Sequence, residues 1–442
     1  MNAPHNILII AFKFPPLGGM RVKRMSMFAK YLAQRGYRVH VITVNWRVRA
    51  PNTWAAETKN PKIIVHRISS WAPHNLLYRL PESLPAKLLS RAVHLLRRGL
   101  YFVDEAQWWG LSLLPYATRL IKTENITNVI CTGAPFMANY WAARLKHKLP
   151  HIHLIQDLRD PWNDHLCAPY SHYFRFGWQK NQSRRYEHYA LTNADVIVSV
   201  TDSLTELFKR RVESPARFVT ISNGFDTEKY SSLSSNPNRE KMRMVYIGNL
   251  FVGRDQVISR FLRTVEELAD ENPDFSHCFE LVTYGGFPHS VRQAAASLIR
   301  RGILRIYGYV TPEEALQIAG NAFALLLVTA EFFTYPSGKI YEYIALRRPI
   351  YAITPEGEAS RLVRRGNLGE YVAPGDPAEQ KKSLLKLFDL WKRNPAYTPP
   401  VKQDFIQEFR YDRLVNRLIA CFKQRDGEKA SIGQTKGWSQ GL

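Results

Sequence analysis

The chain has 442 residues, of which 45% are hydrophobic and 22% are charged. These fractions are those of ordinary globular proteins and exclude a fibrous or wholly disordered chain. The length exceeds what one hydrophobic core usually supports, so it predicts two or three domains. The net charge of +23 favours polyanions, anionic lipid surfaces or phosphorylated substrates as partners, without selecting among them.

The spacing of the cysteines and the hydropathy of the chain indicate the cellular compartment of the protein. The cysteines Cys131, Cys167, Cys278 and Cys421 lie far apart, and no pair has the spacing of a metal site. We expect reduced, structural thiols and no bound metal ion. The apolar run Ile7–Ile10 is too short for the core of a signal peptide, and no stretch of about 18 apolar residues predicts a transmembrane helix. These features predict a cytoplasmic protein.

Strands and helices alternate from the start of the chain. The apolar run Ile7–Phe12 predicts a buried parallel strand, apolar residues from Val22 to Leu32 follow at helical spacing, and Arg38–Val44 predicts a second strand. Together they form one βαβ unit. Further predicted strands of the first half are Ile63–His66, Asn128–Cys131, His153–Asp157, Asp195–Val200 and Phe218–Ile221.

A second series of strands follows the polar segment Ser231–Arg239, whose Ser, Asn and Pro content is typical of a linker. Two successive series predict an α/β protein with two doubly wound, Rossmann-like domains facing a cleft. The strands of the second series are Met244–Ile247, Phe279–Tyr284, Leu304–Tyr307, Ala324–Val328, Ile350–Ile353 and Tyr371–Ala373.

The same features set the domain boundaries. We assign residues 1–226 to the first domain, 227–240 to the linker and 241–403 to the second domain. Residues 404–425 are predicted to form a C-terminal helix, near Phe405–Lys423, that packs back toward the first domain. The polar segment 426–442 is predicted to be a disordered tail.

Ligands of doubly wound sheets bind beyond the carboxyl ends of the strands, so the loops there are candidate sites. The loop after the first strand, FPPLGGMRVKR, contains Gly18 and Gly19, which let the backbone approach a ligand closely. Arg21, Lys23 and Arg24 would attract an anion to it. A plain turn between strand and helix is the alternative interpretation.

The loop DLRDPW at 157–162 follows another predicted strand. Asp157 or Asp160 could orient or deprotonate a hydroxyl group, and Arg159 could bind an anion or neutralise the two carboxylates. A self-contained cluster of ion pairs is the alternative.

In the second domain, the loop YIGNLFVGRD is tightened by Gly248 and Gly253. It places Arg254 where it could reach a phosphate, or where it could be a solvated arginine in a turn. This loop is therefore a candidate phosphate-binding site in the second domain.

The segment EFFTYPSGKIYEY at 331–343 is the most informative. Ser337 and Gly338 are typical of a helix start, with Ser337 as a possible N-cap. Backbone amides and Lys339 would then face a diphosphate, and Glu342 would lie near two ribose hydroxyls. Lysine in a first turn opposes the helix dipole, which favours a bound anion over an ordinary surface helix.

Five motifs in this order resemble glycosyltransferase family 4, the retaining nucleotide-sugar enzymes of GT-B architecture. They span residues 7 to about 375 and resemble most the bacterial enzymes that build surface polysaccharides. The motifs are FPPLGG with two following arginines, DLRDPW, NGFD at 223–226, YIGNL at 246–250 and PSGKIYEYIALRRPI at 336–350.

The resemblance implies a role for each matching residue. Gly18 and Gly19 would approach the phosphates of the donor, and Glu342 would hold its ribose. Glu331 is a candidate contact to the transferred sugar. The residues implied to hold the diphosphate are Arg254, Lys339 and the amides of Ser337 and Gly338.

The resemblance also implies the reaction. The chain would move a sugar from a nucleoside-diphosphate sugar to a hydroxyl of a glycan or lipid-linked acceptor, with retention of configuration and without a metal ion or cofactor. A sugar-nucleotide epimerase or hydrolase of the same fold would need no acceptor. The other alternative is a non-catalytic polyanion-binding protein, in which Glu342 would have no role. Nucleic acid is not expected as a partner, because the sequence has no nucleic-acid-binding motif.

Two basic segments bear on the acceptor. Ala86–Leu100 can form an amphipathic helix with basic residues around an apolar face, and Tyr170–Tyr189 mixes aromatic residues with Lys and Arg. Both would suit an anionic membrane surface or a lipid-linked acceptor at the inner membrane face. A core-facing helix and a solvated loop are the alternatives.

Overall fold

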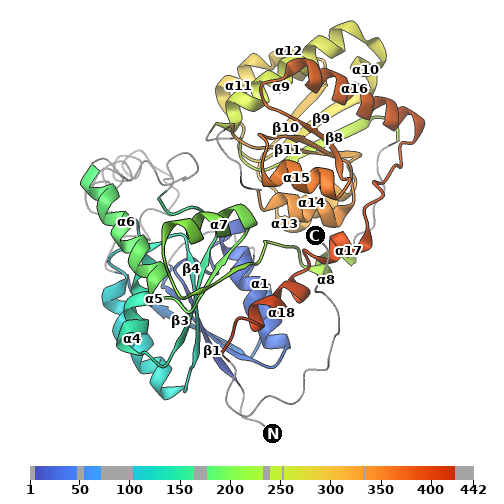
Figure 1. Cartoon of the computed structure of the whole chain (residues 1–442). Coiled ribbons are helices and arrows are strands. Elements are labelled where there is room, and N and C mark those ends of the chain that lie inside the picture. The colour runs from blue at the N-terminus through green and yellow to red at the C-terminus, as the bar shows by residue number, and fades with distance from the viewer. Residues whose placement is uncertain are drawn as a thin grey trace, which may run out of the picture.

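The computed structural model describes residues 5–46, 54–70, 103–163, 177–231, 239–250, 253–331, 335 and 337–423. Two domains, each built on a fully parallel sheet with helices on its faces, follow one another along the chain (Figure 1). The N-terminal domain is coloured blue to green, and the C-terminal domain yellow to orange. The predicted fold class, two doubly wound Rossmann-like domains, is confirmed.

The N-terminal sheet has seven strands in the order β3-β2-β1-β4-β5-β6-β7. Every predicted strand of the first half is present, because each is a short apolar run that is buried on both faces of a parallel sheet. The strands are β1 Asn6–Ala11, β2 Arg38–Val44, β3 Ile63–Ile68, β4 Asn128–Gly133, β5 His153–Leu158, β6 Val196–Ser199 and β7 Arg217–Thr220.

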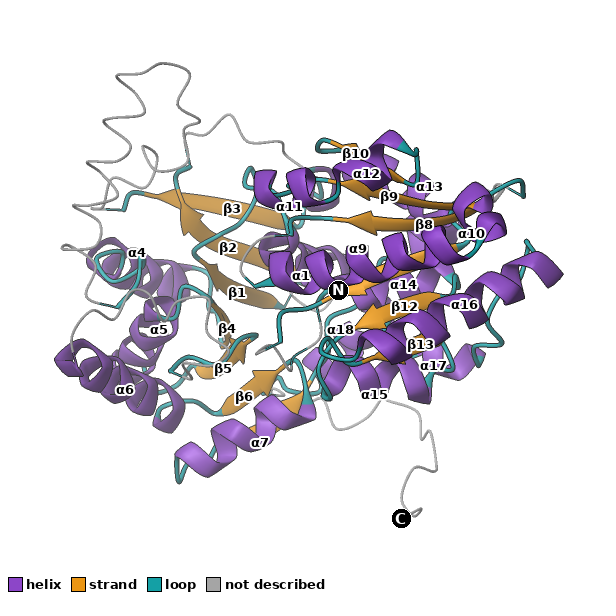
Figure 2. Cartoon of the chain, turned by 90° about the horizontal axis from the view of Figure 1, so that it is seen from above, coloured by secondary structure: helices purple, strands orange, loops and turns teal. Residues whose placement is uncertain are grey.

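Helices cover both faces of this sheet. Three of them, α4, α5 and α6, pack side by side on one face, whereas α1 lies on the other (Figures 1 and 2). The described helices of this domain are α1 Met20–Gln34, the short 3-10 helix η1 Ala56–Thr58, α4 Gly110–Thr123, α5 Met137–Lys148, α6 Gly177–Thr192, α7 Asp202–Arg211 and α8 Thr227–Ser231.

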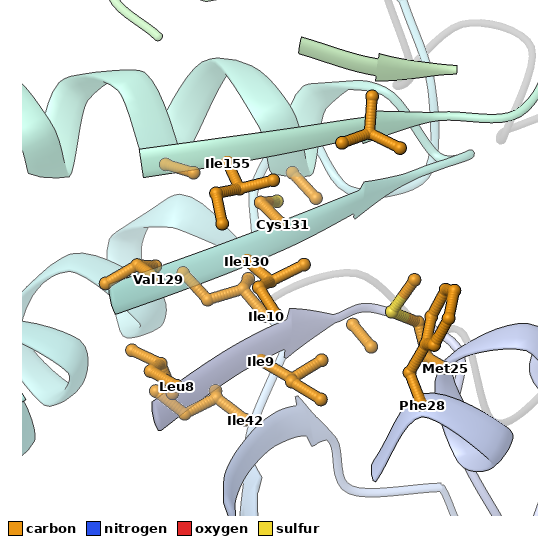
Figure 3. Packing of buried hydrophobic residues seen from close by; sticks show 14 of the residues in the cluster. Leu8, Ile9, Ile10, Met25, Phe28, Ile42, Val129, Ile130, Cys131 and Ile155 are labelled. Atoms are coloured by element: carbon orange, nitrogen blue, oxygen red, sulfur yellow. The ribbon is translucent and has the colours of Figure 1, made fainter. Parts of the chain in front are cut away.

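The core of the domain lies between these layers. Residues 7–11 of β1 are at most 1% exposed. Figure 3 shows Ile9 and Ile10 of β1 among side chains of β2, β4 and β5, with Met25 and Phe28 of α1 packed beside them. Removing this apolar surface from water is the main force that holds the layers together.

The C-terminal sheet has six strands in the order β10-β9-β8-β11-β12-β13. Its strands are β8 Met242–Ile247, β9 Phe279–Tyr284, β10 Leu304–Tyr307, β11 Ala324–Val328, β12 Ile350–Ile353 and β13 Gly369–Val372. Its helices are α9 Arg254–Glu271, α10 Pro273–Cys278, α11 His289–Ala294, α12 Ala296–Arg300, α13 Pro312–Gly320, α14 Lys339–Leu346, α15 Glu358–Arg365 and α16 Pro377–Arg393.

The predicted C-terminal helix is divided in two, α17 Gln403–Gln407 and α18 Tyr411–Ile419. The break has a physical cause, since the backbone between them pairs with Phe225: its N–H donates to the Phe409 carbonyl at 2.9 Å, and its carbonyl accepts from Tyr411 N–H at 3.1 Å. Figure 1 shows α18, in red, on the N-terminal domain beside α1. The end of the described chain therefore belongs to the first core.

Three further findings concern the expectations from sequence. Among the described helices, none is long and apolar enough to cross a membrane. The amphipathic segment Ala86–Leu100 lies outside the described residues, and Tyr170–Tyr189 is described only from Gly177 onward, as part of α6. The described cysteines Cys131, Cys278 and Cys421 are free thiols.

The packing of α18 generates a prediction for stability. Tyr411 is 1% exposed, and its ring meets Phe28 of α1 edge to face with 5.6 Å between centroids. Tyr411→Ala should lower the free energy of unfolding in urea by about 3–5 kcal/mol. The exposed Lys382→Ala of α16 should change it by less than about 0.5 kcal/mol. Equal stability of the two variants would show that α18 is not part of the first core.

Candidate functional site

Each sheet reverses its strand order at one point, between β1 and β4 in the first and between β8 and β11 in the second. Ligands of doubly wound sheets bind in the crevice at such a point. The loops that leave β1 and β8 contribute Gly19 and Gly248 to one cavity of about 180 Å³, which is completed by α13, α14 and the segment around Lys229. The cavity therefore lies between the two domains.

The lining of this cavity combines two kinds of side chain. Some are charged, among them Lys23, Lys339 and Glu342. The apolar part of the lining comes mainly from α13, α14 and the loop before α13. A ligand with an anionic part and a flat, less polar part would match both kinds. The residues of the apolar part are Tyr309, Val310, Pro312, Ala315, Leu316, Ala319 and Leu346.

Both glycine loops bring backbone close to the charged side chains of the lining. Gly19 precedes α1 with φ +89°, and its carbonyl accepts a hydrogen bond from Trp54 Nε1 at 3.0 Å, while Gly18 beside it is half-buried. At Gly248, φ is +133° and an added Cβ would come within 2.0 Å of Lys339 Nζ. Any side chain at Gly248 would displace the amine, so the glycine is required for the position of Lys339.

Lys339 is the first residue of α14, and its Nζ lies 4.5 Å from the ring centroid and 3.5 Å from the hydroxyl oxygen of Tyr246. Burial, together with the positive charge of Arg254, lowers the pKa of Lys339 to about 7, although Glu342 acts in the opposite direction. Within the part of the chain that the structure describes, neither Lys339 nor Arg254 forms an ion pair. An anion between them would relieve their repulsion.

The start of α14 differs from the expectation. Gly338 is the residue before the helix and already has helical backbone angles, φ −54° and ψ −19°, and no side chain caps the helix. The predicted capping by Ser337 is therefore not observed; instead its carbonyl accepts from Ile340 N–H at 3.1 Å. Apart from Ile340 N–H, the first amides of α14 have no partner within the helix, as at any helix start, and can bind an anion.

Glu342 forms an ion pair with Lys23 of α1, with 2.5 Å between Oε1 and Nζ. The pair joins the two domains across the cavity, and the two side chains are 23% and 4% exposed, respectively. The ammonium group of Lys23 also lies 5.5 Å from the ring centroid of Trp54. This pair is not predictable from the sequence, because its members are 319 positions apart and on different domains.

Asp157 and Arg24 form a buried ion pair instead of facing the cavity. Each is 1% exposed, and Arg24 Nη2 lies 2.8 Å from Asp157 Oδ1. The carboxylate also accepts from the Thr132 hydroxyl at 2.9 Å, and Arg24 donates to the carbonyls of Ile221 and Ser222. The expectation that Arg24 attracts a ligand anion is wrong, because its guanidinium group is used inside the domain.

The other predicted residues are spread over both domains. Arg159 is half-buried and donates from Nε to the Gly133 carbonyl at 2.8 Å. Asp160 is half-buried and has no hydrogen bond or ion pair among the described residues. Glu331 is exposed, forms an ion pair with Arg260 of α9 and does not line the cavity. The structure thus brings Gly19, Lys339 and Glu342 together, but not Glu331.

A cluster that the sequence did not predict surrounds Asp226, the last residue of the NGFD motif. Its carboxylate accepts from the Tyr31 hydroxyl at 2.5 Å and pairs with Lys30 at 2.8 Å. Burial opposes the charge of Lys30, but its hydrogen bonds to Asp226, Glu228 and Glu57 outweigh burial and raise its pKa. The cluster fixes the segment between the domains to α1, and the NGFD motif was its only signal in the sequence.

The described side chains were also compared with the ligand sets of metal sites. No group of three or more His, Cys, Asp or Glu residues within the described ranges is arranged to hold a metal ion. The charged groups at the cavity are instead three cations and the carboxylates of Asp226 and Glu342.

Comparisons with known proteins agree with this geometry. Residues 22–229 match the family model described as Glycosyltransferase Family 4. Among curated proteins, none matches the sequence.

Three similar structures cover nearly the whole chain. A glycosyltransferase from Rickettsia africae ESF-5 aligns with TM-score 0.60 and 14% identity, covering 94% of this chain and 97% of its own. The lipopolysaccharide outer core galactosyltransferase WaaB aligns with TM-score 0.57 and 15% identity over 94% and 99% of the two chains. Anabaena HepE, in complex with UDP, aligns with TM-score 0.56 and 12% identity over 95% and 99%.

These likenesses show the fold, and the family match covers the N-terminal domain with the first part of the segment that follows it. The resemblance expected from the five motifs is confirmed. Residues 22–229, just under half of the chain, are thus similar to glycosyltransferase family 4, and the two domains have the GT-B fold.

Proposed function

We propose that the protein transfers a sugar from a nucleoside-diphosphate sugar to a hydroxyl group of an acceptor, with retention of configuration. The observation that carries this proposal is Lys339, which lines the interdomain cavity under the positive charge of Arg254; neither cation has an ion-pair partner among the described residues. A buried positive charge without a counter-ion is unfavourable unless a ligand supplies the anion. The diphosphate of the donor is such an anion.

The rest of the donor follows from the cavity. With the diphosphate on Lys339, Arg254 and the first amides of α14, the ribose would reach Glu342, and the base would lie on the apolar part of the lining, where Tyr309 is 67% exposed. The N-terminal domain would be the acceptor domain, and Gly18 and Gly19 would approach the phosphates from it. The similar structure of HepE was solved with UDP, which supports a nucleotide in this type of cleft.

In the proposed reaction, the bond between the sugar and the diphosphate breaks while the acceptor oxygen bonds to the same carbon. Negative charge grows on the leaving diphosphate, and Lys339, Arg254 and the positive end of α14 stabilise it. This neutralisation requires neither a metal ion nor a cofactor. We assign Asp160 to orient the acceptor hydroxyl, with Asp157 and Arg159 fixing its loop, and Glu331 remains a candidate contact to the sugar.

A sugar-nucleotide epimerase or hydrolase would use the same donor site. Product analysis separates the alternatives, because only a transferase requires an acceptor hydroxyl. A polyanion-binding protein without catalytic activity would bind oligonucleotides in a strongly salt-dependent way and would not depend on Glu342.

The first prediction concerns Glu342. In a thermal-shift screen against UDP, GDP, ADP, CMP and their common sugars, one base should raise Tm, because a ligand that binds only the folded protein stabilises it by about 2.7 kcal/mol at 100 times its Kd. Glu342→Ala should abolish this shift by removing the ribose contact. Glu271→Ala, an exposed carboxylate on α9, is the matched control and should retain it.

Two results of this screen would refute the donor site. One is the absence of a Tm shift with any nucleotide in a folded sample, and the other is an undiminished shift in Glu342→Ala.

The second prediction concerns protonation. With its pKa lowered to about 7, Lys339 is mostly neutral at pH 8, and a bound diphosphate should restore its charge. Binding at pH 8 should therefore take up roughly 0.9 proton, and affinity should fall as pH rises above 7. Calorimetry in two buffers of different ionisation enthalpy measures this uptake. Lys339→Arg, which stays charged, should bind without it; equal uptake by both proteins would rule out Lys339 as the group responsible.

The acceptor is proposed to be a glycan or a lipid-linked intermediate in the synthesis of surface polysaccharides. WaaB, a similar structure, is a lipopolysaccharide galactosyltransferase, which supports an acceptor of this kind. Helix α6 presents Arg184 and Arg185 to solvent, with Trp178 54% exposed near its start. We propose that this face contacts the anionic inner membrane surface and that the protein otherwise resides in the cytoplasm.

Flotation with vesicles that contain phosphatidylglycerol tests this contact. The protein should float with these vesicles but not with neutral ones, and Arg184→Glu with Arg185→Glu should reduce the bound fraction several-fold. Lys381→Glu with Lys382→Glu on α16 makes the same change in net charge and should have less effect. Equal binding by both double variants would contradict a specific role for α6.

A further inference from the structure

The ion pair between Lys23 and Glu342 occupies the carboxylate that the proposed function assigns to the ribose. Its 2.5 Å separation leaves no room for a ribose hydroxyl between the two groups. Because Lys23 holds Oε1, Glu342 can accept from both ribose hydroxyls, one on each carboxylate oxygen, only if Lys23 gives up at least part of this contact. Lys23, with its side chain 4% exposed, cannot simply turn into bulk solvent.

A buried ammonium group that loses its counter-ion must find another anion nearby. The diphosphate would lie in the same cavity, since Lys23, Lys339 and Gly19 line it together. Lysine suits such an exchange, because its charge sits on a flexible four-carbon chain.

We propose that Lys23 exchanges partners when the donor binds: it holds Glu342 in the free protein and binds the diphosphate once the ribose has taken Glu342. This inference rests on the proposed function. It makes Lys23 a donor-binding residue contributed by the acceptor domain, on the opposite side of the cavity from Lys339. The exchange also replaces a direct contact between the domains with one that runs through the donor.

The surroundings of Lys23 support this role. Trp54 is held in place by its hydrogen bond to the Gly19 carbonyl, and its ring lies 5.5 Å from Lys23 Nζ and 4.9 Å from Lys229 Nζ. The indole is thus fixed beside the glycine loop that faces the phosphates, and it limits where the ammonium group can go.

The charge balance supports the exchange as well. In the free protein Glu342 neutralises Lys23, which leaves Lys339 and Arg254 without counter-ions among the described residues. Once the ribose has replaced Lys23 on Glu342, the diphosphate meets three cations from both domains.

The exchange predicts opposite effects on two ligands. A nucleoside must displace Lys23 from Glu342 but offers no phosphate in return, so removing the Lys23 charge should strengthen its binding. A nucleoside diphosphate gains the Lys23 contact, so removing the charge should weaken its binding. A purely structural lysine would change both affinities in the same direction.

Isothermal titration calorimetry with Lys23→Met tests this prediction. The ligands are uridine and UDP, guanosine and GDP, or adenosine and ADP, according to the base that the screen selects. Relative to the unchanged protein, Lys23→Met should bind the diphosphate at least about tenfold more weakly and the nucleoside about threefold or more tightly. Lys382→Met, which removes a distant exposed charge of α16, should change neither affinity more than about twofold.

Lys23→Arg is the second variant, because it keeps the charge and should keep the diphosphate affinity within about threefold. Loss of both affinities in Lys23→Met, or no change in either, would overturn the exchange even if the donor site is correct. Failure of the unchanged, folded protein to bind any diphosphate would instead refute the proposed function, and the exchange with it.

Discussion

The charges at the interdomain cavity are the constraint on which the proposed chemistry depends. Lys23 and Lys339 line it from α1 and α14, Arg254 at the start of α9 acts electrostatically on Lys339, and Glu342 is paired with Lys23 alone. Such an arrangement is unfavourable for a protein alone, as the lowered pKa of Lys339 shows. It becomes favourable when a ligand brings negative charge. Relief of the repulsion between the cations therefore contributes to the affinity for an anion.

The fold explains how these charges are held in place. Each sheet reverses its order at the strand whose loop carries a glycine with positive φ, Gly19 in one domain and Gly248 in the other. At Gly248 the absence of a side chain admits the amine of Lys339. At Gly19 the backbone carbonyl holds Trp54, which lies beside Lys23. The glycines therefore serve the position of the cations as well as the approach of a ligand.

The connection between the domains is fixed at the same place. Asp226 joins the segment that leaves the first domain to Lys30 and Tyr31 of α1, and α18 packs against the same helix. Helix α1 thus carries Lys23, which lines the cavity, and also Lys30 and Tyr31, which hold the connecting segment. A displacement of this helix would change both the cavity and the angle between the domains.

The sequence alone predicts most of the fold, because buried parallel strands such as Ile7–Phe12 are apolar runs that local composition reveals. It also places Gly19, Lys339 and Glu342 at the carboxyl ends of strands, where the structure brings them together. It does not predict that Arg24 and Asp157 pair inside the domain, or that Lys23 meets Glu342, 319 positions away. Such pairs depend on how elements pack, and charged residues in a loop look the same whether they face a ligand or one another.

A crystal structure of the protein with a bound nucleoside diphosphate would test the central claim most directly. The account predicts diphosphate oxygens within hydrogen-bond distance of Lys339 Nζ and the Arg254 guanidinium, and a ribose hydroxyl on Glu342 in place of Lys23. A nucleotide bound outside the interdomain cavity, or one bound there with the diphosphate away from both cations, would contradict it.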